Sequence, residues 1–332
     1  MQKDWVWRVH FFNRKILSLL SKICVSIFIF WILFSRIELS DVLEALLKTD
    51  IFFILFAILL TFMGILLGVY RWKLSLTVKK IHVSFMMILN ATLISRFIGL
   101  IFPAFIGADA IRGYDLYKQI KEGDNIFASI LFERICGLVS LVVIGSCALL
   151  FSMGQTENLS LIKPYILVYL VLFFVIISCF SKVITTLAIS FFEITPRFKW
   201  VRDKIENLSE AIYMYRGYHK LWISVMSLSM LYQFQGILFY YLIGLSLSLE
   251  IPLITFSVLI PIINLVTMIP ISPGGLGVKE GMFVILFNQY GVAPAEALSI
   301  SLIGTSLYLI SVLIGSIVYF TRPKALSTNP HM

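Results

Sequence analysis

Residues 269–281 have the sequence IPISPGGLGVKEG and lie inside an otherwise apolar stretch of about residues 252–292. An apolar stretch this long would ordinarily form a membrane-spanning helix, because about 20 such residues cross the hydrocarbon layer. Here the prolines and the closely spaced glycines prevent a helix from continuing. Irregular backbone at membrane depth is tolerated only where it lies against protein or lines a water-filled cavity. The stretch therefore predicts a broken helical segment within a membrane protein.

A second apolar stretch is also interrupted. It covers about residues 83–106, contains Arg96, and breaks near Pro103 and Gly107. Six other stretches are long enough to span a bilayer without a break. The expected fold is an all-α integral membrane protein, one polytopic domain over residues 1–332, with about six spans and two re-entrant or broken hairpins. The spans are expected at about residues 16–34, 51–70, 125–151, 163–181, 220–245 and 296–320.

The composition agrees with a membrane protein. Hydrophobic residues make up 59% of the 332 residues and charged residues only 14%, whereas soluble domains have about 25% charged residues. The formal net charge is +9, but the basic residues flank apolar stretches, which indicates membrane topology and contact with anionic lipids. We therefore expect no nucleic-acid partner. The four cysteines lie in apolar stretches without a C-x-x-C pair, so neither a disulfide framework nor a metal site is indicated.

The distribution of Lys and Arg predicts the orientation, because cytoplasmic loops are enriched in both. It places the N-terminus, residues 71–82, residues 182–220 and the C-terminus on the cytoplasmic side of the cell membrane. Residues 83–124 must then begin and end on the cytoplasmic side, and residues 252–292 on the outer side. Each broken stretch is therefore expected to be a hairpin that enters the membrane and returns.

This order of segments also predicts an inverted repeat, with halves at about residues 15–155 and 160–322. An offset of 168 residues aligns Gly107 with Gly275 and Gly113 with Gly281. Transporters built from inverted repeats bind their substrates at broken helices in matching positions. Residues 37–49 are expected to form an amphipathic helix on the outer surface, and residues 190–218 a basic amphipathic helix in the cytoplasm.

Ionisable side chains inside the bilayer are costly, which makes them candidates for function. Arg96 is expected either to hold a lipid phosphate, to pair with Glu133, or to extend to the membrane surface. Asp109 and Arg112 are three residues apart and share a helix face, so they are either a headgroup contact or the first turn of a helix. Glu133 and Arg134 point about 100° apart on a helix, so each needs a partner elsewhere. Arg96 and Arg112 are candidates for Glu133, in a polar cavity lining or a structural ion network.

The glycine-rich stretch has two interpretations as well. Its backbone amides and a restarting helix could bind phosphate, or it could be a simple outer turn. Glu280 is a candidate for proton coupling or for pairing with an arginine. Arg71-Trp72 is expected to be an anchor at the membrane surface. No motif predicts a catalytic residue, a metal site or a cofactor. The expected headgroup cavity contains Arg96, Asp109, Arg112, Glu133, Arg134, Pro273, Gly274, Gly275, Gly277 and Glu280.

Four motifs resemble the family named after the transmembrane region of lysylphosphatidylglycerol synthase, also called the flippase-like domain family. They are Arg71-Trp72, residues 102–113, residues 129–137 and residues 273–281. The resemblance implies a multi-pass bacterial or archaeal protein. In bifunctional members of that family, the membrane part moves aminoacylated phosphatidylglycerol between leaflets, and a separate domain makes this lipid. This chain has no synthetase domain, so the resemblance implies a stand-alone member.

The expected function is therefore that of a lipid transporter, or flippase, for an aminoacylated phospholipid or a lipid-linked sugar. Its expected partners are anionic or phosphate-bearing membrane lipids and a separate synthetase or glycosyltransferase. The alternative is a membrane enzyme or an accessory subunit in the synthesis of such lipids. The absence of a sugar-nucleotide or metal motif favours the transporter, and the oligomeric state stays open.

Overall fold

The computed structural model describes residues 21–22, 24–78, 81, 83–100, 104–152, 210, 213–269 and 271–322. These residues form helices, turns and loops without a strand. The predicted span at 163–181 and most of the predicted helix at 190–218 lie outside the described residues. The all-α fold class is confirmed.

Four helices in the described part of the chain are long and apolar enough to cross a membrane. They confirm the spans expected at 51–70, 125–151, 220–245 and 296–320, and each is longer than expected. At the first of them, the Asp50 side chain accepts a hydrogen bond from the amide of Phe52 and caps the helix start. The four helices are α3 (Ile51–Thr77), α6 (Gly123–Ser152), α10 (His219–Ser246) and α13 (Pro294–Thr321).

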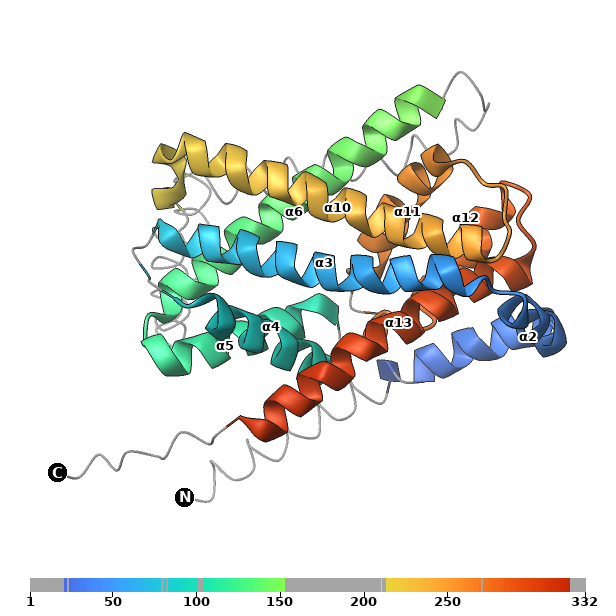
Figure 1. The fold of residues 1–332 in the computed structure, drawn as a ribbon, viewed down its shortest axis with the longest axis horizontal. Coiled ribbons are helices and arrows are strands. Elements are labelled where there is room, and N and C mark those ends of the chain that lie inside the picture. The colour runs from blue at the N-terminus through green and yellow to red at the C-terminus, as the bar shows by residue number, and fades with distance from the viewer. Residues whose placement is uncertain are drawn as a thin grey trace, which may run out of the picture.

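Both broken stretches form hairpins of two shorter helices. The first consists of α4 (Phe85–Gly99) and α5 (Ala104–Ile120), and the second of α11 (Leu253–Thr267) and α12 (Val278–Asn288). Figure 1 shows the two hairpins at opposite ends of the long helices. We call these the α5 end, where α3 ends and α6 begins, and the α2 end. Each hairpin begins and ends at the same end of the molecule, as the charge distribution predicted.

Smaller helices cover the α2 end (Figure 1). Helix Cys24–Arg36 corresponds to the first predicted span. The helix α2 (Leu39–Leu47) confirms the amphipathic helix expected at 37–49, since Val42 is buried whereas Leu43 and Leu47 are exposed. A short 3₁₀ helix, η3 (Met214–Gly217), precedes α10 at the α5 end, where the Tyr215 hydroxyl donates a 2.9 Å hydrogen bond to the carbonyl of Ser75 on α3.

Helices of each half pack against helices of the other half. Helix α4 of the first half packs on α13 of the second, and α11 of the second half packs on α6 of the first. Between them, α3 and α10 pack along each other. An inverted repeat would produce such an exchange, and the repeat itself stays a prediction.

Candidate functional site

Helices α3, α5 and α6 bring five charged side chains together, and we call this group the ionic cluster. Glu133 of α6 is at its centre and is only 2% exposed. Its Oε1 accepts a hydrogen bond from Arg71 Nε at 3.0 Å, and Arg112 Nη2 lies 3.1 Å from its Oε2. Both arginines are 7% exposed. The cluster consists of Arg71, Asp109, Arg112, Glu133 and Arg134.

Asp109 is the second carboxylate of the cluster. Its Oδ1 accepts a hydrogen bond of 2.9 Å from Arg112 Nε and another of 2.9 Å from Arg134 Nη2. Arg112 therefore connects the two carboxylates. Glu133 and Arg134 pair with different groups, as their angular separation on one helix predicted. Arg112 is a partner of Glu133, whereas the proposed pairing of Arg96 with Glu133 is wrong.

Aromatic rings and hydroxyls hold the arginines in place. The Arg112 guanidinium lies 4.7 Å from the centre of the Trp72 ring, whose Nε1 donates a 3.0 Å hydrogen bond to Ser129. Arg71 lies 4.9 Å from the centre of the Tyr232 ring, and its Nη1 donates to Ser229 at 3.3 Å. Such cation–π contacts stabilise a desolvated guanidinium.

The expectation that Arg71-Trp72 is a surface anchor is therefore wrong. Trp72 is fully buried, and Arg71 is buried against α6 and α10. The helix continues to Thr77, so the pair lies inside it and not at its end. The sequence shows an arginine within a helix-forming stretch, which could have indicated that Arg71 is buried. Its partners on α6 and α10 could not be predicted because they are distant in sequence.

The ionic cluster has an excess of positive charge. Three arginines face two carboxylates, which leaves one positive charge within the cluster. Glu133 Oε2 is fully enclosed and accepts no well-directed hydrogen bond from a described residue, although Arg112 lies beside it. Arg134 is the most accessible member, with a side chain 33% exposed. Counted by themselves, these five groups carry a net positive charge that would attract an anion.

Arg96 lies apart from the ionic cluster, in the contact between α4 and α13. Its Nη1 donates a 3.1 Å hydrogen bond to Ser311, and its guanidinium lies 5.6 Å from the centre of the Tyr308 ring. It makes no ion pair with a described residue.

Glu280 is completely buried at the start of α12. Its Oε2 accepts a 2.7 Å hydrogen bond from the amide of Gly277, which caps the helix. Its Oε1 accepts hydrogen bonds from Ser301 at 3.2 Å and Thr305 at 3.3 Å, both on α13. Among the described residues its cationic neighbour is Lys279, at 3.8 Å, and none of the described arginines pairs with it.

The glycine-rich turn packs against helix Cys24–Arg36. Ser26 Oγ donates a 3.0 Å hydrogen bond to the carbonyl of Leu276. Gly277 has a φ of +84°, and a Cβ atom there would lie 3.2 Å from the Ser26 carbonyl oxygen. The amide of Gly277 is already bonded to Glu280. These contacts give the turn a structural role, and headgroup binding by Pro273, Gly274, Gly275 and Gly277 stays a prediction.

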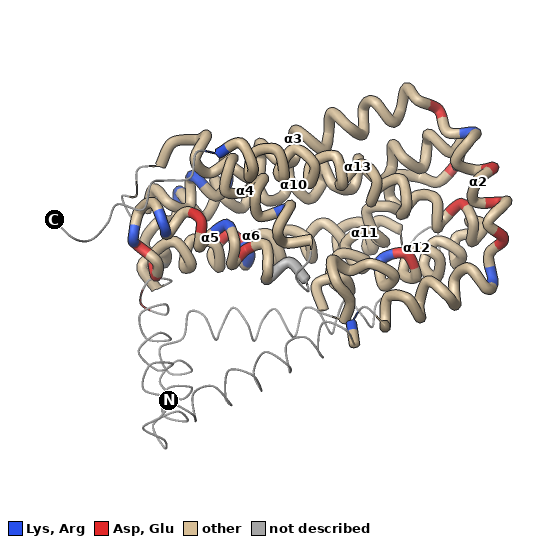
Figure 2. The backbone as a smooth tube through the Cα atoms, turned by 90° about the horizontal axis from the view of Figure 1, so that it is seen from below, with Lys and Arg blue, Asp and Glu red and all other residues tan. Residues whose placement is uncertain are grey.

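The ten predicted cavity residues thus form separate groups. Figure 2 shows charged residues on α5 and α6 at one end of the molecule and others on α12 towards the other end. No described hydrogen bond or ion pair joins the ionic cluster to Glu280 or to the glycine-rich turn. The structure brings together Asp109, Arg112, Glu133 and Arg134, and adds Arg71.

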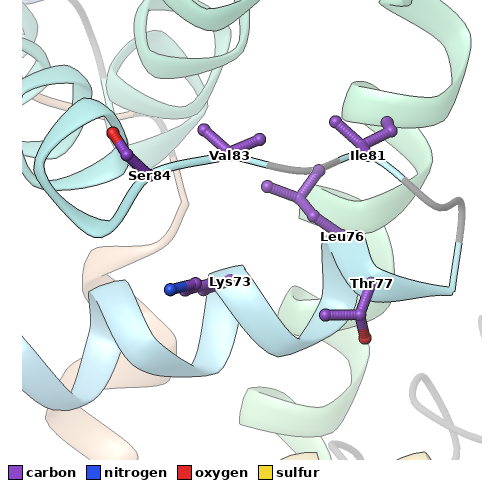
Figure 3. Close-up of a pocket in the computed structure, with 6 residues that line it drawn as sticks. All are labelled: Lys73, Leu76, Thr77, Ile81, Val83 and Ser84. Carbon is purple, nitrogen blue, oxygen red and sulfur yellow. The ribbon is translucent and has the colours of Figure 1, made fainter.

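A pocket of about 320 Å³ lies near the α5 end, between the end of α3 and the start of α4. Figure 3 shows its lining, in which Lys73 is the charged side chain. No member of the ionic cluster lines it. Ser84 at its rim caps α4 through the amide of Met87, so the pocket has no arrangement of groups that indicates a ligand.

Sequence comparison identifies archaeal relatives. The UPF0104 membrane protein PH1989 of Pyrococcus horikoshii is 28% identical, over 86% of this chain and 92% of that protein. A UPF0104 membrane protein of Methanothermobacter thermautotrophicus is 22% identical, over 85% of this chain and 89% of that protein. The UPF0104 membrane protein MJ1078 of Methanocaldococcus jannaschii is 26% identical, over 70% of this chain and 97% of that protein.

No solved structure matches the chain significantly. The family model described as the lysylphosphatidylglycerol synthase TM region matches residues 19–315. This match includes the ionic cluster, Arg96 and the glycine-rich turn. The chain therefore belongs to the lysylphosphatidylglycerol synthase TM region family.

Proposed function

We propose that this protein moves lipids with a polar, phosphate-bearing headgroup between the two leaflets of the cell membrane. The observation that supports this most directly is the ionic cluster. It places five charged groups, with a positive excess, between the first hairpin and two helices, α3 and α6, that are long enough to span a bilayer. A purely structural set of helices would not need to desolvate so many charges.

The depth of the cluster strengthens the argument. At 1.5 Å per residue, Glu133 lies about 15 Å from the start of α6, and Arg71 about 9 Å from the end of α3. Both distances start at the α5 end. At the same rise α3 and α6 are about 40 and 45 Å long, against a hydrocarbon layer of ~30 Å, so the cluster lies in the part of the span nearer the α5 end. A charged residue at the centre of a membrane helix costs about 2.5–3.5 kcal/mol on insertion scales. Charges kept inside a membrane usually mark a substrate pathway.

Each group has a role in the proposed mechanism. Arg112 and Arg134 offer planar donors that suit a phosphate, while Asp109 and Glu133 hold them in place when no lipid is bound. The acyl or prenyl chains stay in the surrounding lipid. Movement of one half against the other would then expose the headgroup to the second leaflet. Glu133 and Glu280 are the candidates for proton coupling.

A leaflet-sidedness assay tests the proposal. Purified protein is inserted into liposomes that contain headgroup-labelled lipids, including aminoacylated phosphatidylglycerol and polyprenyl-phosphate sugars. A membrane-impermeant reductant then reports which labels reach the outer leaflet. We expect faster exposure of at least one lipid, lost in Arg134→Gln and retained in Arg36→Gln, a matched change at an exposed arginine. If correctly inserted wild-type protein moves none of these lipids, the transport proposal is refuted and a biosynthetic or accessory role replaces it.

A further inference from the structure

We propose that Arg96, Tyr308 and Ser311 form a second anion site, which binds the phosphate of a membrane lipid between α4 and α13. The inference rests on the proposed function for its place in transport, because it names where a headgroup is held beyond the ionic cluster. Binding of the lipid at this site is a separate property and is tested separately.

The position of these residues on α13 establishes the depth of the site. Tyr308 and Ser311 lie 14 and 17 residues after the first residue of this 28-residue helix. At 1.5 Å per residue, Ser311 is about 26 Å from one end of the helix and about 15 Å from the other. The nearer end is the α5 end, where Arg322 pairs with Asp115 of α5 at 2.8 Å. The Arg96 guanidinium is therefore held near the middle of a spanning helix.

Arg96 has no counter-charge among the described residues. Arginine stays protonated in proteins, yet the described neighbours of Arg96 are a hydroxyl and an aromatic ring. Neither group neutralises the positive charge. The carboxylates of Asp109 and Glu133 are engaged by the arginines of the ionic cluster. A cation at this depth without a counter-charge is costly, and a bound anion would supply that counter-charge.

The Arg96 guanidinium has further donors for such an anion. A guanidinium has five N–H donors, and Arg96 uses Nη1 for its hydrogen bond to Ser311. Ser311 is 1% exposed and donates its own proton to the carbonyl of Tyr308. Its oxygen is thereby fixed as an acceptor for Arg96. The guanidinium is held in one orientation, while its other donors suit the paired oxygens of a phosphate.

The surroundings indicate that the anion belongs to a lipid. Tyr308 is 38% exposed, so the site reaches the surface of the helix bundle. Arg96 itself is partly buried. Helix α13 is apolar and long enough to span a membrane, so a phosphate at this depth would have to be carried by a lipid whose chains stay in the hydrocarbon layer. A lipid therefore fits the site better than a dissolved ion does.

Lipid binding is measured with the full chain in detergent micelles, by native mass spectrometry against added phosphatidylglycerol. Phosphatidylcholine and inorganic phosphate serve as comparison ligands. Loss of a charge-assisted contact should weaken phosphatidylglycerol binding by about tenfold or more in Arg96→Gln. Arg96→Lys should retain part of the binding, Ser311→Ala should lose part of it, and Arg36→Gln should bind as the wild type does.

The outcomes separate this inference from the proposed function. Unchanged phosphatidylglycerol binding in Arg96→Gln overturns the site. If inorganic phosphate binds at the site as well as phosphatidylglycerol does, the assignment of the site to a lipid is overturned. If wild-type protein binds phosphatidylglycerol through Arg96 but moves no lipid in liposomes, the site stands and the transport proposal fails. If Arg96→Gln does not fold, Ser311→Ala and Arg96→Lys decide the matter, and normal binding by both refutes the site.

Discussion

Replacing Arg71 with Met tests whether the ionic cluster is a coupled unit. Arg71 donates Nε and Nη2 to Glu133 and Nη1 to Ser229. Without it, Glu133 keeps the ionic contact with Arg112 but no well-directed hydrogen bond from that residue. Removing one partner of a buried ion pair typically costs about 3–5 kcal/mol, because the other charge stays desolvated. We therefore expect Arg71→Met to lower the free energy of unfolding by about this amount.

Glu133→Gln is the second change in a double-mutant cycle with Arg71→Met. It removes the central negative charge and leaves Arg71 and Arg112 facing each other. In the double variant, Arg71→Met with Glu133→Gln, the uncompensated carboxylate is absent. Its loss of stability should be smaller than the sum of the two single losses by about 1–3 kcal/mol. The cycle thus measures the coupling and not the effect of each side chain alone.

Denaturant titration of the purified protein in detergent, followed by tryptophan fluorescence, would measure these free energies. Arg36→Gln serves as the control because that side chain is exposed, and it should shift the midpoint little. A loss below about 0.5 kcal/mol for Arg71→Met, the level expected for an ordinary surface change, would refute the buried pairing. Strict additivity of the two variants would refute the coupling.

Four further variants test other parts of the structure. Glu280→Ala removes the cap of α12 and should cost about 1–2 kcal/mol in the same titration; an unchanged midpoint would rule out the capping role. Gly277→Ala places a Cβ near Ser26 at a φ of +84°, whereas Gly274→Ala has open space at +59°. Both should lose about 1 kcal/mol or more from the backbone, and a loss at Gly277 no larger than at Gly274 would contradict the packing of helix Cys24–Arg36 on the turn. Leu43→Glu on α2 should leave stability nearly unchanged but reduce contact of this helix with lipid, measured by quenching of a nearby fluorophore with brominated lipids; unchanged quenching would argue against a surface helix.

The spans and hairpins could be predicted because their signals are local. Long apolar stretches locate α3, α6, α10 and α13, and Pro and Gly locate the breaks. The distribution of Lys and Arg then required each broken stretch to return to its own side. The pairing partners of the charged residues were only partly predictable. Helix geometry showed that Glu133 and Arg134 need different partners, but the choice of Arg71 depends on how α3 packs against α6.

The glycine-rich turn shows a different limit of sequence analysis. Its composition shows that a helix ends and another begins. It does not show that Glu280 occupies the Gly277 amide or that helix Cys24–Arg36 covers the turn. The first contact is local, across three residues, whereas the second depends on a segment brought in by the fold. Both compete with the anion-binding role that free amides would have.

Two contacts lie at positions that the inverted repeat would make equivalent. Arg112 of α5 pairs with Glu133 of α6, and Glu280 of α12 bonds to Ser301 of α13. The offset of 168 residues, which aligns Gly107 with Gly275, relates Arg112 to Glu280 and Glu133 to Ser301.

The same offset relates the points where the hairpins close. A Cβ on Gly99 would lie 3.1 Å from the Cα of Ala108, and a Cβ on Gly275 would lie 3.4 Å from the Cβ of Thr267. Gly99 corresponds to Thr267, and Gly275 corresponds to the residue before Ala108. Equivalent backbone positions would then carry side chains of opposite charge, because Arg112 in the first hairpin corresponds to Glu280 in the second. An anionic headgroup would be attracted at one end of the path and not at the other. An experimental structure in which α4–α5 and α11–α12 are not related by a two-fold axis would contradict the repeat and this electrical asymmetry together.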